Sequence, residues 1–337
     1  MKAIIPVAGK GTRLKPHTHS TPKPLLEIAG KPILAYIIDE ILTVSEIDEI
    51  VLILGHLGKE IESYISGYVK EKKISFVYQE VLNGDGGAIR LGIENILKGT
   101  RVDDDLLIIF GDTLIDFNLR KALKEKEKYD GIIFAKEVKE PWMYGVIVTN
   151  EQGIIIDIEE KPQKPKSNLA VIGAYWFKSM NLVYKKILTL FEKNITTKGE
   201  YKLADAMGLM IKENHCLKAI KVKEWFDCGR VDILLEANKY MLDKLCEGKK
   251  VVRGNCLIIG PAYVAHTAQI ENSIIGPYAS IGENTKIKNC IIKNSIIGKG
   301  TTLNNLTIYD SVIGKEVVVE SQEKKLNIGD NSVLLFE

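Results

Sequence analysis

The 337-residue sequence has few cysteines and histidines, almost no net charge and no long apolar run. Its five cysteines lack CxxC spacing, which indicates free thiols rather than a structural zinc site. A formal charge of +2, from 46 basic and 44 acidic residues, gives no overall field for nucleic acid or anionic lipid, so any anion site is local. The apolar run at the N-terminus, about five residues long, is too short for a signal sequence or a membrane span. We therefore expect a cytoplasmic protein with neither a nucleic-acid nor a membrane partner.

Two kinds of segment alternate over the first 110 residues. Apolar, β-branched runs, which predict strands buried on both faces, lie at 3–7, 49–54, 74–78 and 106–110. Segments of helical period lie between them, at 33–42, 58–72 and 87–97. This alternation predicts βαβ units and a mostly parallel sheet. Because such sheets bind ligands at the carboxyl ends of their strands, the segments after Val7 and after Phe110 are the first candidates for a site.

The pattern changes twice further along the chain. Shorter alternating strands begin near Gly131, with helices expected at 182–192, 203–213 and 231–246, and this half is typical of a substrate lobe. After Lys250 the chain is rich in isoleucine, asparagine and glycine, and its apolar positions 259, 275, 292 and 308 recur after 16 or 17 residues. That spacing predicts a short parallel β-helix of about four coils with a triangular cross-section. We expect a catalytic domain over 1–248 and the β-helix over 249–337.

A glycine-rich, basic segment begins where the first strand is expected to end. Its candidate phosphate-binding residues are Gly9, Gly11, Thr12, Arg13 and Lys23. Glycines let the backbone approach a phosphate, and consecutive amides in such a turn form an anion-binding concavity. The guanidinium and the ammonium add cations for a triphosphate. A dinucleotide-binding fingerprint would need a third glycine and a P-loop would need GK[ST], and neither is present.

The phrase GKGTRLKP, followed by PKPLL, resembles the signature of the sugar-1-phosphate nucleotidyltransferases. The resemblance covers roughly residues 1–240 and is closest to the thymidylyl and uridylyl members that use glucose 1-phosphate. It implies an α/β core with a mostly parallel, Rossmann-like sheet. It also implies that the tail is the left-handed β-helix of hexapeptide-like repeats that many longer members carry. In that family the loop that starts at Ala8 wraps the triphosphate, Arg13 holds the departing pyrophosphate, and Lys23 contacts the phosphates at the reacting centre.

Two aspartates are candidate metal ligands. Asp112 follows the apolar run LLIIFG, and Asp227 lies in WFDCGR. A lone aspartate at a strand end is usually a cap. Two of them in a phosphate enzyme suit Mg²⁺, which binds one or two carboxylates together with substrate phosphates. The resemblance assigns both residues to Mg²⁺, although many relatives have threonine where Arg230 stands.

Further residues are candidates for binding the base and the sugar. Gln79 precedes a glycine-rich stretch that includes Gly84, and a carboxamide matches the imide edge of uracil or thymine. The stretch could equally be a helix start. The run IEEKPQKPKSNLAVIGAYWF is close to the thymidylyltransferase pattern. This resemblance gives the sugar hydroxyls to Glu160, its phosphate to Lys161, and backbone contacts with the sugar to Gly145 and Val171.

These expectations combine into one reaction with three alternatives. A sugar 1-phosphate, most simply glucose 1-phosphate, attacks the α-phosphate of dTTP or UTP, and pyrophosphate leaves, with Arg13, Lys23 and Lys161 as the catalytic cations. The alternatives are a guanylyltransferase, a non-catalytic regulatory paralogue, and a bifunctional enzyme whose tail carries an acetyltransferase site with His266 as its base. We expect the β-helix to pack or to form a homo-oligomer.

Overall fold

The computed structural model describes residues 1–70, 72–99, 103–246, 248 and 250–321. The chain divides into two compact units, one made of Met1–Glu27 with Lys31–Ala237 and the other of Ile28–Gly30 with Asn238–Glu337. The division falls within helix α7 (Val231–Leu245). In the described part of the chain, no helix is both long and apolar enough to cross a membrane.

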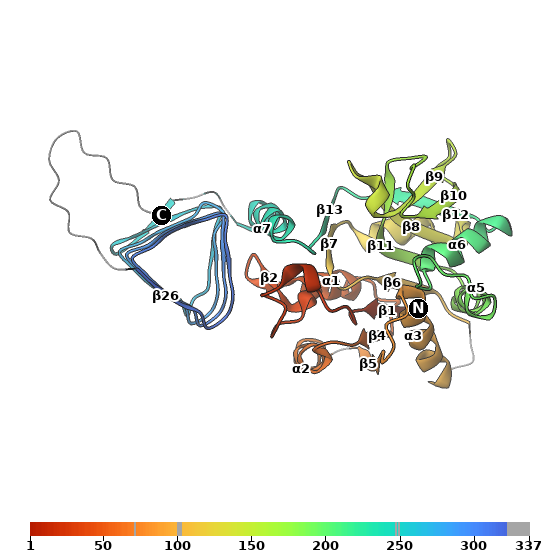
Figure 1. The fold of residues 1–337 in the computed structure, drawn as a ribbon, viewed down its shortest axis with the longest axis horizontal. Helices are drawn as coiled ribbons and strands as arrows, with labels where there is room; N and C mark the ends of the chain where they lie inside the picture. The colour runs from red at the N-terminus through yellow and green to blue at the C-terminus, as the bar shows by residue number, and fades with distance from the viewer. Residues whose placement is uncertain (71, 100–102, 247, 249, 322–337) are drawn as a thin grey trace. The chain divides into compact units, whose positions relative to one another are not determined.

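A nine-stranded mixed sheet forms the centre of the first unit (Figure 1). Its strands are β1 (Lys2–Pro6), β4 (Glu49–Leu54), β5 (Lys73–Tyr78), β6 (Leu106–Ile109), β8 (Gly131–Glu137), β9 (Gly145–Thr149), β10 (Ile155–Glu160), β11 (Leu169–Phe177) and β12 (Leu217–Lys221). β5, β4, β1 and β6 are parallel neighbours, as the alternation of apolar runs and helices predicts, because parallel strands need crossover connections. β11 joins β6 antiparallel and carries β8 and β9. The predicted α/β fold with a mostly parallel sheet is confirmed.

Helices cover both faces of this sheet. They are α1 (Ile33–Leu42), α2 (Gly58–Tyr68), α3 (Asp85–Gly99), α5 (Met180–Glu192) and α6 (Leu203–Lys212). Because successive side chains of a strand point to opposite faces, Ile5 packs in a core with α1 and α2, whereas Ile4 packs in a second core with α3, α5 and α6. Shorter elements are β2 (Glu27–Ile28), β3 (Lys31–Pro32), α4 (Leu119–Ala122) and the 3₁₀ turns at Lys23–Leu25, Leu123–Lys128 and Pro141–Met143.

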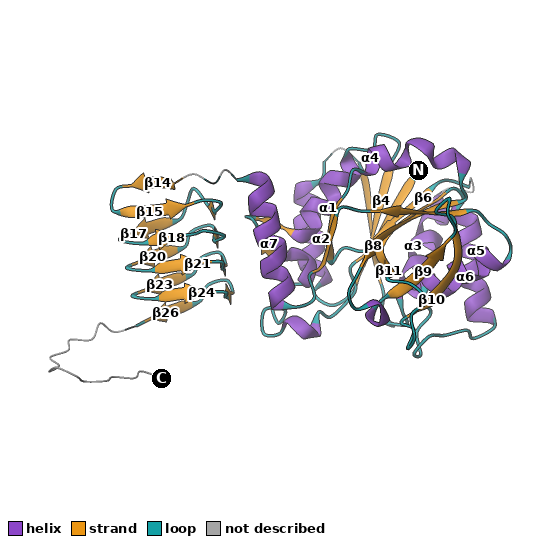
Figure 2. Ribbon diagram, turned by 90° about the horizontal axis from the view of Figure 1, so that it is seen from above, coloured by secondary structure: helices purple, strands orange, loops and turns teal. Residues whose placement is uncertain are grey.

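Three stacked parallel sheets form the second unit, and its coils have a triangular outline in Figure 1 and lie one above another in Figure 2. The first sheet contains β14 (Lys250–Arg253), β15 (Cys256–Ile259), β18 (Ile274–Ile275), β21 (Ile291–Lys293) and β24 (Thr307–Tyr309). The second contains β16 (Tyr263–Val264), β19 (Ser280–Ile281), β22 (Ile296–Ile297) and β25 (Val312–Ile313). The third contains β17 (Gln269–Glu271), β20 (Lys286–Lys288), β23 (Thr302–Asn304) and β26 (Val318–Glu320). All these pairs are parallel except β14 with β15, so the predicted parallel β-helix is confirmed.

One predicted core position of the β-helix is wrong by a single residue. Ile258, not Ile259, is the register partner of Ile275, and Ile258 packs against the core of the coils. Since neighbouring side chains of a strand face opposite ways, a shift of one residue exchanges inside and outside. The inward positions 258, 275 and 292 are thus 17 residues apart, and Ile308 follows Ile292 after 16.

A short loop from the N-terminal part of the sequence belongs to the second unit. The buried side chain of Asn238 accepts hydrogen bonds through Oδ1 from the Ala29 amide at 2.8 Å and from Ser280 Oγ at 2.7 Å. Its Nδ2 donates to the Tyr278 carbonyl at 3.3 Å. These bonds fix the loop Ile28–Gly30 against the coil that carries Ser280.

Replacing Gly276 by alanine is expected to destabilise the β-helix by roughly 2–4 kcal/mol, because a strained φ and a backbone clash add. Gly276 has φ +97°, and a Cβ there would lie 2.0 Å from the Ile259 carbonyl oxygen. Gly300 is the matched control: its φ is +71°, but a Cβ would meet only the flexible Glu316 side chain, at 3.3 Å. Gly300→Ala should therefore cost about 1 kcal/mol, the conformational part alone. Differential scanning calorimetry checks the order, and equal losses for the two variants would contradict the clash.

Candidate functional site

The loop after β1 brings the glycine-rich segment to the carboxyl end of the central strands. It continues into a 3₁₀ turn at Thr12–Leu14, preceded by Gly11 with φ 60°. Thr18 Oγ donates to the Gly11 carbonyl at 2.9 Å and closes the loop on itself. The loop therefore has a defined shape, with its backbone directed by a residue in the left-handed region.

Lys23 lies between the two aspartates. Its Nζ is 2.9 Å from Asp112 Oδ2 and 3.2 Å from Asp227 Oδ1, and Lys23 is only 5% exposed. Burial by itself would lower the pKa of Lys23, but the charges of both carboxylates outweigh burial and raise it. The ammonium is therefore a fixed positive charge at neutral pH.

A second, two-stranded sheet brings the aspartates together. Strand β7 (Thr113–Asp116) pairs antiparallel with β13 (Glu224–Asp227), and the register places Asp227 opposite Thr113. Asp112 directly precedes Thr113, so two residues 115 positions apart in the sequence become neighbours across one ladder. Arg13 reaches the same place, with Nη2 3.5 Å from Asp227 Oδ2, and is 57% exposed.

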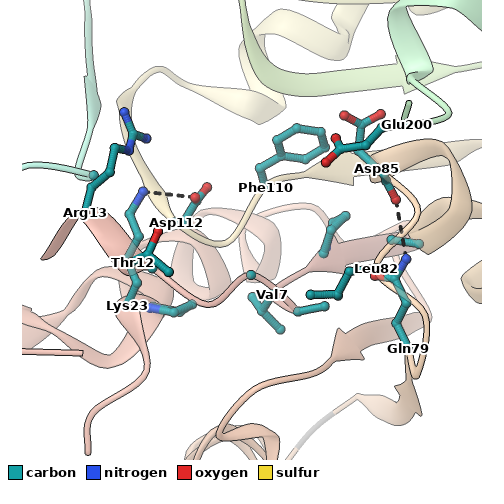
Figure 3. Close-up of a pocket in the computed structure, with 18 residues that line it drawn as sticks. Val7, Thr12, Arg13, Lys23, Gln79, Leu82, Asp85, Phe110, Asp112 and Glu200 are labelled. Carbon is teal, nitrogen blue, oxygen red and sulfur yellow. Dashed lines mark hydrogen bonds and ion pairs between the residues drawn. The ribbon is translucent and has the colours of Figure 1, made fainter. Parts of the chain in front are cut away.

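A cavity of about 370 Å³ contains all the residues predicted to bind the nucleotide (Figure 3). They are Ala8, Gly9, Gly11, Thr12, Arg13, Lys23, Gln79 and Gly84. Figure 3 shows Thr12, Arg13, Lys23 and Asp112 at one end and Gln79 with Leu82 at the other. Gln79 is buried, and its Nε2 donates to Asn83 Oδ1 at 3.1 Å and to the Gly84 carbonyl at 3.4 Å. The predicted phosphate and base residues thus lie at opposite ends of one pocket.

A neighbouring cavity of about 680 Å³ contains the residues predicted to bind the sugar, Gly145, Glu160, Lys161 and Val171. Gly145 allows them to converge, because a Cβ there would lie 2.8 Å from both Glu160 Oε2 and Val171 Cγ2. Burial raises the pKa of Glu160, the charge of Asp85 raises it further, and Lys161 opposes the shift. The Lys161 ammonium is 3.9 Å from Glu160 Oε1.

The two cavities share four lining residues: Arg13, Asp85, Phe110 and Asp112. Lys23 lines the smaller cavity and Asp227 the larger one. The ion-paired cluster of Lys23, Asp112 and Asp227 therefore lies where a ligand in one cavity would meet a ligand in the other.

Sequence reasoning missed several residues of these cavities. Asp85, Phe110, Tyr175, Lys202 and Trp225 line one or both of them. The sequence contains a signal for Phe110, because this residue ends the apolar run before Asp112 and so lies at the carboxyl end of a central strand. Asp85 and Lys202 had none, since each is one charged residue in a polar stretch, and only the fold brings them together.

Comparison with known proteins identifies the family. The family model described as "Nucleotidyl transferase" matches residues 2–244. The chain belongs to the nucleotidyl transferase family. This membership agrees with the resemblance of its signature loop to the sugar-1-phosphate nucleotidyltransferases.

Two relatives are similar to this chain over more residues than the family model matches. The chain is 39% identical over 267 residues to the bifunctional protein GlmU of Methanocaldococcus jannaschii, covering 77% of this chain and 60% of the relative. It is 32% identical over 322 residues to a bifunctional sugar-1-phosphate nucleotidylyltransferase/acetyltransferase of Sulfurisphaera tokodaii, covering 88% of this chain and 75% of the relative. The chain thus spans less than two thirds of the length of the first relative.

A solved structure resembles the fold. The UDP-glucose pyrophosphorylase complexed with UDP-glucose is similar with a TM-score of 0.62 and 27% identity, over 72% of this chain and 98% of that one.

Proposed function

We propose that this nucleotidyltransferase joins a sugar 1-phosphate to a pyrimidine nucleoside triphosphate and releases pyrophosphate. The observation that carries the proposal is the meeting of the two cavities at Arg13 and Asp112, beside buried Lys23. The triphosphate binds in the smaller cavity with its base at Gln79, and the sugar binds in the larger one. The solved relative in complex with UDP-glucose supports a uracil-containing ligand and a hexose.

In this reaction an oxygen of the sugar phosphate attacks the α-phosphorus of the triphosphate. A new phosphorus–oxygen bond forms as the bond to the pyrophosphate oxygen breaks, and pyrophosphate leaves with the electron pair. The nucleophile is already an anion, so no general base is required. Catalysis then depends on position and on charge neutralisation. Lys23 supplies a fixed charge at the reacting phosphate, Arg13 holds the departing pyrophosphate, and Lys161 orients the sugar phosphate.

The residues present fit a magnesium ion. Asp112 and Asp227 offer carboxylate oxygens on either side of one ammonium. In the described part of the chain, no cluster of three or more His, Cys, Asp or Glu side chains forms a metal site. The two carboxylates suit Mg²⁺, which would take its remaining ligands from substrate phosphates and water. When bound, it would neutralise charge on the phosphates.

Gln79 should decide the choice of base. Its Nε2 is held by Asn83 and Gly84, so its carboxamide oxygen is the group that accepts from the imide N–H of uracil or thymine. We expect Gln79→Ala to lower kcat/KM for UTP and dTTP about 10- to 100-fold, with no change in KM for the sugar 1-phosphate. Glu80→Ala, at the exposed neighbouring residue, is the control and should keep both values. A Gln79 variant with unchanged kcat/KM for UTP would show that the base binds elsewhere.

The defining experiment is a matrix of UTP, dTTP, GTP and ATP against several sugar 1-phosphates, with pyrophosphate release as the readout. We expect UTP and dTTP to dominate, with little difference between them, because one methyl group gives only a small discrimination. Dominance of GTP would favour the guanylyltransferase alternative. No release with any pair would favour a regulatory paralogue, although Arg13, Lys23, Asp112 and Asp227 are all present.

A second candidate function is acetyl transfer by the β-helix, as in a bifunctional enzyme. Both relatives described above are named as bifunctional, and this favours the bifunctional alternative over an enzyme with the first activity alone. His266 is exposed on the turn between β16 and β17 and is the candidate base. Incubation with acetyl-CoA and an amino-sugar phosphate should then release thiol in the wild type but not in His266→Ala. Equal thiol release by both proteins would exclude His266.

A further inference from the structure

Two charged residues on the wall of the larger cavity have no role in the proposed transfer of the nucleotidyl group. Asp85 is the first residue of α3 and lines both cavities. Lys202 directly precedes α6 and lines the larger cavity. The two helix starts come together there, although 117 residues separate the two positions in the sequence.

These side chains form a partly buried ion pair. Lys202 Nζ is 3.6 Å from Asp85 Oδ2, and the side chains are 15% and 22% exposed. Lys202 also pairs with Glu200, and Asp85 Oδ1 accepts from the Leu203 amide at 2.6 Å. Glu160, whose side chain is 12% exposed, lines the same cavity, and its charge acts on Lys202.

Stability alone is a poor reason for this arrangement. Taking charges out of water is costly, and buried ion pairs are often replaceable by apolar residues without loss of stability. Burial raises the pKa of Asp85 and also that of Glu160, as expected where carboxylates are poorly solvated. Here the charged groups face a cavity rather than a packed core, so a ligand in that cavity can form hydrogen bonds with them.

The chemistry of the wall matches hydroxyl groups. A cationic donor, Lys202, lies among carboxylate acceptors, Asp85 and Glu160. A hydroxyl both donates and accepts, so a hydroxylated ring can bridge a donor and an acceptor. A ligand carboxylate would instead be repelled by the two acids, and a deoxy position would not replace the hydrogen bonds that a hydroxyl group makes with the wall.

We propose that Asp85 and Lys202 are specificity-determining residues that bind hydroxyl groups of the sugar. The sugar 1-phosphate substrate then carries a hydroxyl group at the ring position that faces this wall, and its deoxy analogue at that position is a poor substrate. This inference rests on the proposed function, since it assigns the sugar to the larger cavity. Asp85 and Lys202 act on sugar choice, whereas the reacting phosphates lie at Lys23 and Asp112.

The test compares one hexose 1-phosphate with its monodeoxy analogues. The hexose is the one with the highest pyrophosphate release among the sugar 1-phosphates, and glucose 1-phosphate is tried first. In the wild type, at least one analogue should have a kcat/KM about tenfold or more below that of the parent sugar. The missing hydroxyl group removes a hydrogen bond between the sugar and the cavity wall. Lys202→Met keeps the length of the side chain but removes the ammonium. This variant should reduce the ratio of kcat/KM between the parent sugar and that analogue, the hydroxyl-to-deoxy ratio, to about threefold or less. It should also raise KM for the parent sugar and leave KM for UTP unchanged.

Two further variants separate sugar recognition from a structural role. Asp85→Asn keeps an oxygen for the Leu203 amide but removes the charge opposite Lys202, and it should lower the hydroxyl-to-deoxy ratio in the same direction. Lys212→Met, at the exposed far end of α6, is the control and should keep the wild-type ratio. Should Lys202→Met fail to fold, as judged by circular dichroism, Asp85→Asn decides the question.

The outcomes distinguish this inference from the function on which it rests. A wild type that releases no pyrophosphate with any pair of substrates contradicts both. A wild type that turns over all analogues equally well contradicts only the role of Asp85 and Lys202. A folded Lys202→Met or Asp85→Asn variant with the wild-type hydroxyl-to-deoxy ratio also contradicts only the role of Asp85 and Lys202.

Discussion

Replacing Asp112 by asparagine is expected to lower kcat for pyrophosphate release by about 1,000-fold, since a metal ligand at a reacting phosphate contributes several kcal/mol. The carboxamide has nearly the same shape as the carboxylate but carries no charge for Mg²⁺. The side chain of Asp112 is half exposed and Lys23 keeps its pair with Asp227, so the loss of stability should be about 1 kcal/mol or less. Pyrophosphate release and thermal unfolding measure the two effects separately.

Asp116 is the matched control for this prediction. It ends the same strand, β7, and stands opposite Glu224 in the register, away from Lys23. Asp116→Asn should retain kcat within about threefold, as is usual for a substitution outside the site. Undiminished pyrophosphate release by Asp112→Asn would reject Asp112 as a metal ligand. A large drop in the unfolding temperature would instead assign it a structural role.

The helices and central strands could be predicted from the sequence because their signals are local. The segments expected at 33–42 and 49–54 match α1 and β4, and that expected at 203–213 matches α6 within one residue. Each carries an apolar pattern of one period that is buried on the expected face. The β-helix was also predictable, because its repeat imposes the spacing. Its first coil was misplaced by one residue where IIGP offers two adjacent isoleucines and only the pairing with Ile275 selects Ile258.

The site was predictable only where a motif names its residues. The signature loop, Asp112 and Glu160 stand in runs that resemble a known family. The Asp85 and Lys202 pair arises from the packing of α3 against α6, which no local pattern encodes. Likewise, the sequence suggests a role for Asp227 but not its position, which follows from pairing of β13 with β7. Contacts between residues far apart in the sequence depend on the tertiary fold, so no local sequence pattern could predict them.

Lys23→Met is expected to lower kcat by about 100- to 1,000-fold, because it removes a preorganised charge from the reacting phosphate. The variant also leaves Asp112 and Asp227 without the cation that lies between them. We expect the free energy of unfolding at pH 8 to fall by about 1–3 kcal/mol. This loss is smaller than that from breaking a fully buried ion pair, because water reaches both carboxylates. Lys31→Met is the control: Lys31 pairs with Asp39 and lines neither cavity, so kcat should be retained.

The pH dependence gives the Lys23 prediction a second readout. The pKa of Lys23 is raised above 10.5 in the folded protein, so its stabilising effect is fully present below 10.5 and is lost only as pH rises through the higher folded value. Between pH 5 and pH 8 the wild type therefore keeps this contribution constant. The difference in unfolding temperature between wild type and Lys23→Met should therefore stay constant below pH 10.5 and shrink only as pH rises through that higher value. Mg²⁺ at pH 8 should raise the unfolding temperature of Lys23→Met more than that of wild type, and the double variant with Asp112→Asn should lose the extra rise. An equal effect of Mg²⁺ on the unfolding temperatures of wild type and Lys23→Met would show that Lys23 does not balance these two charges.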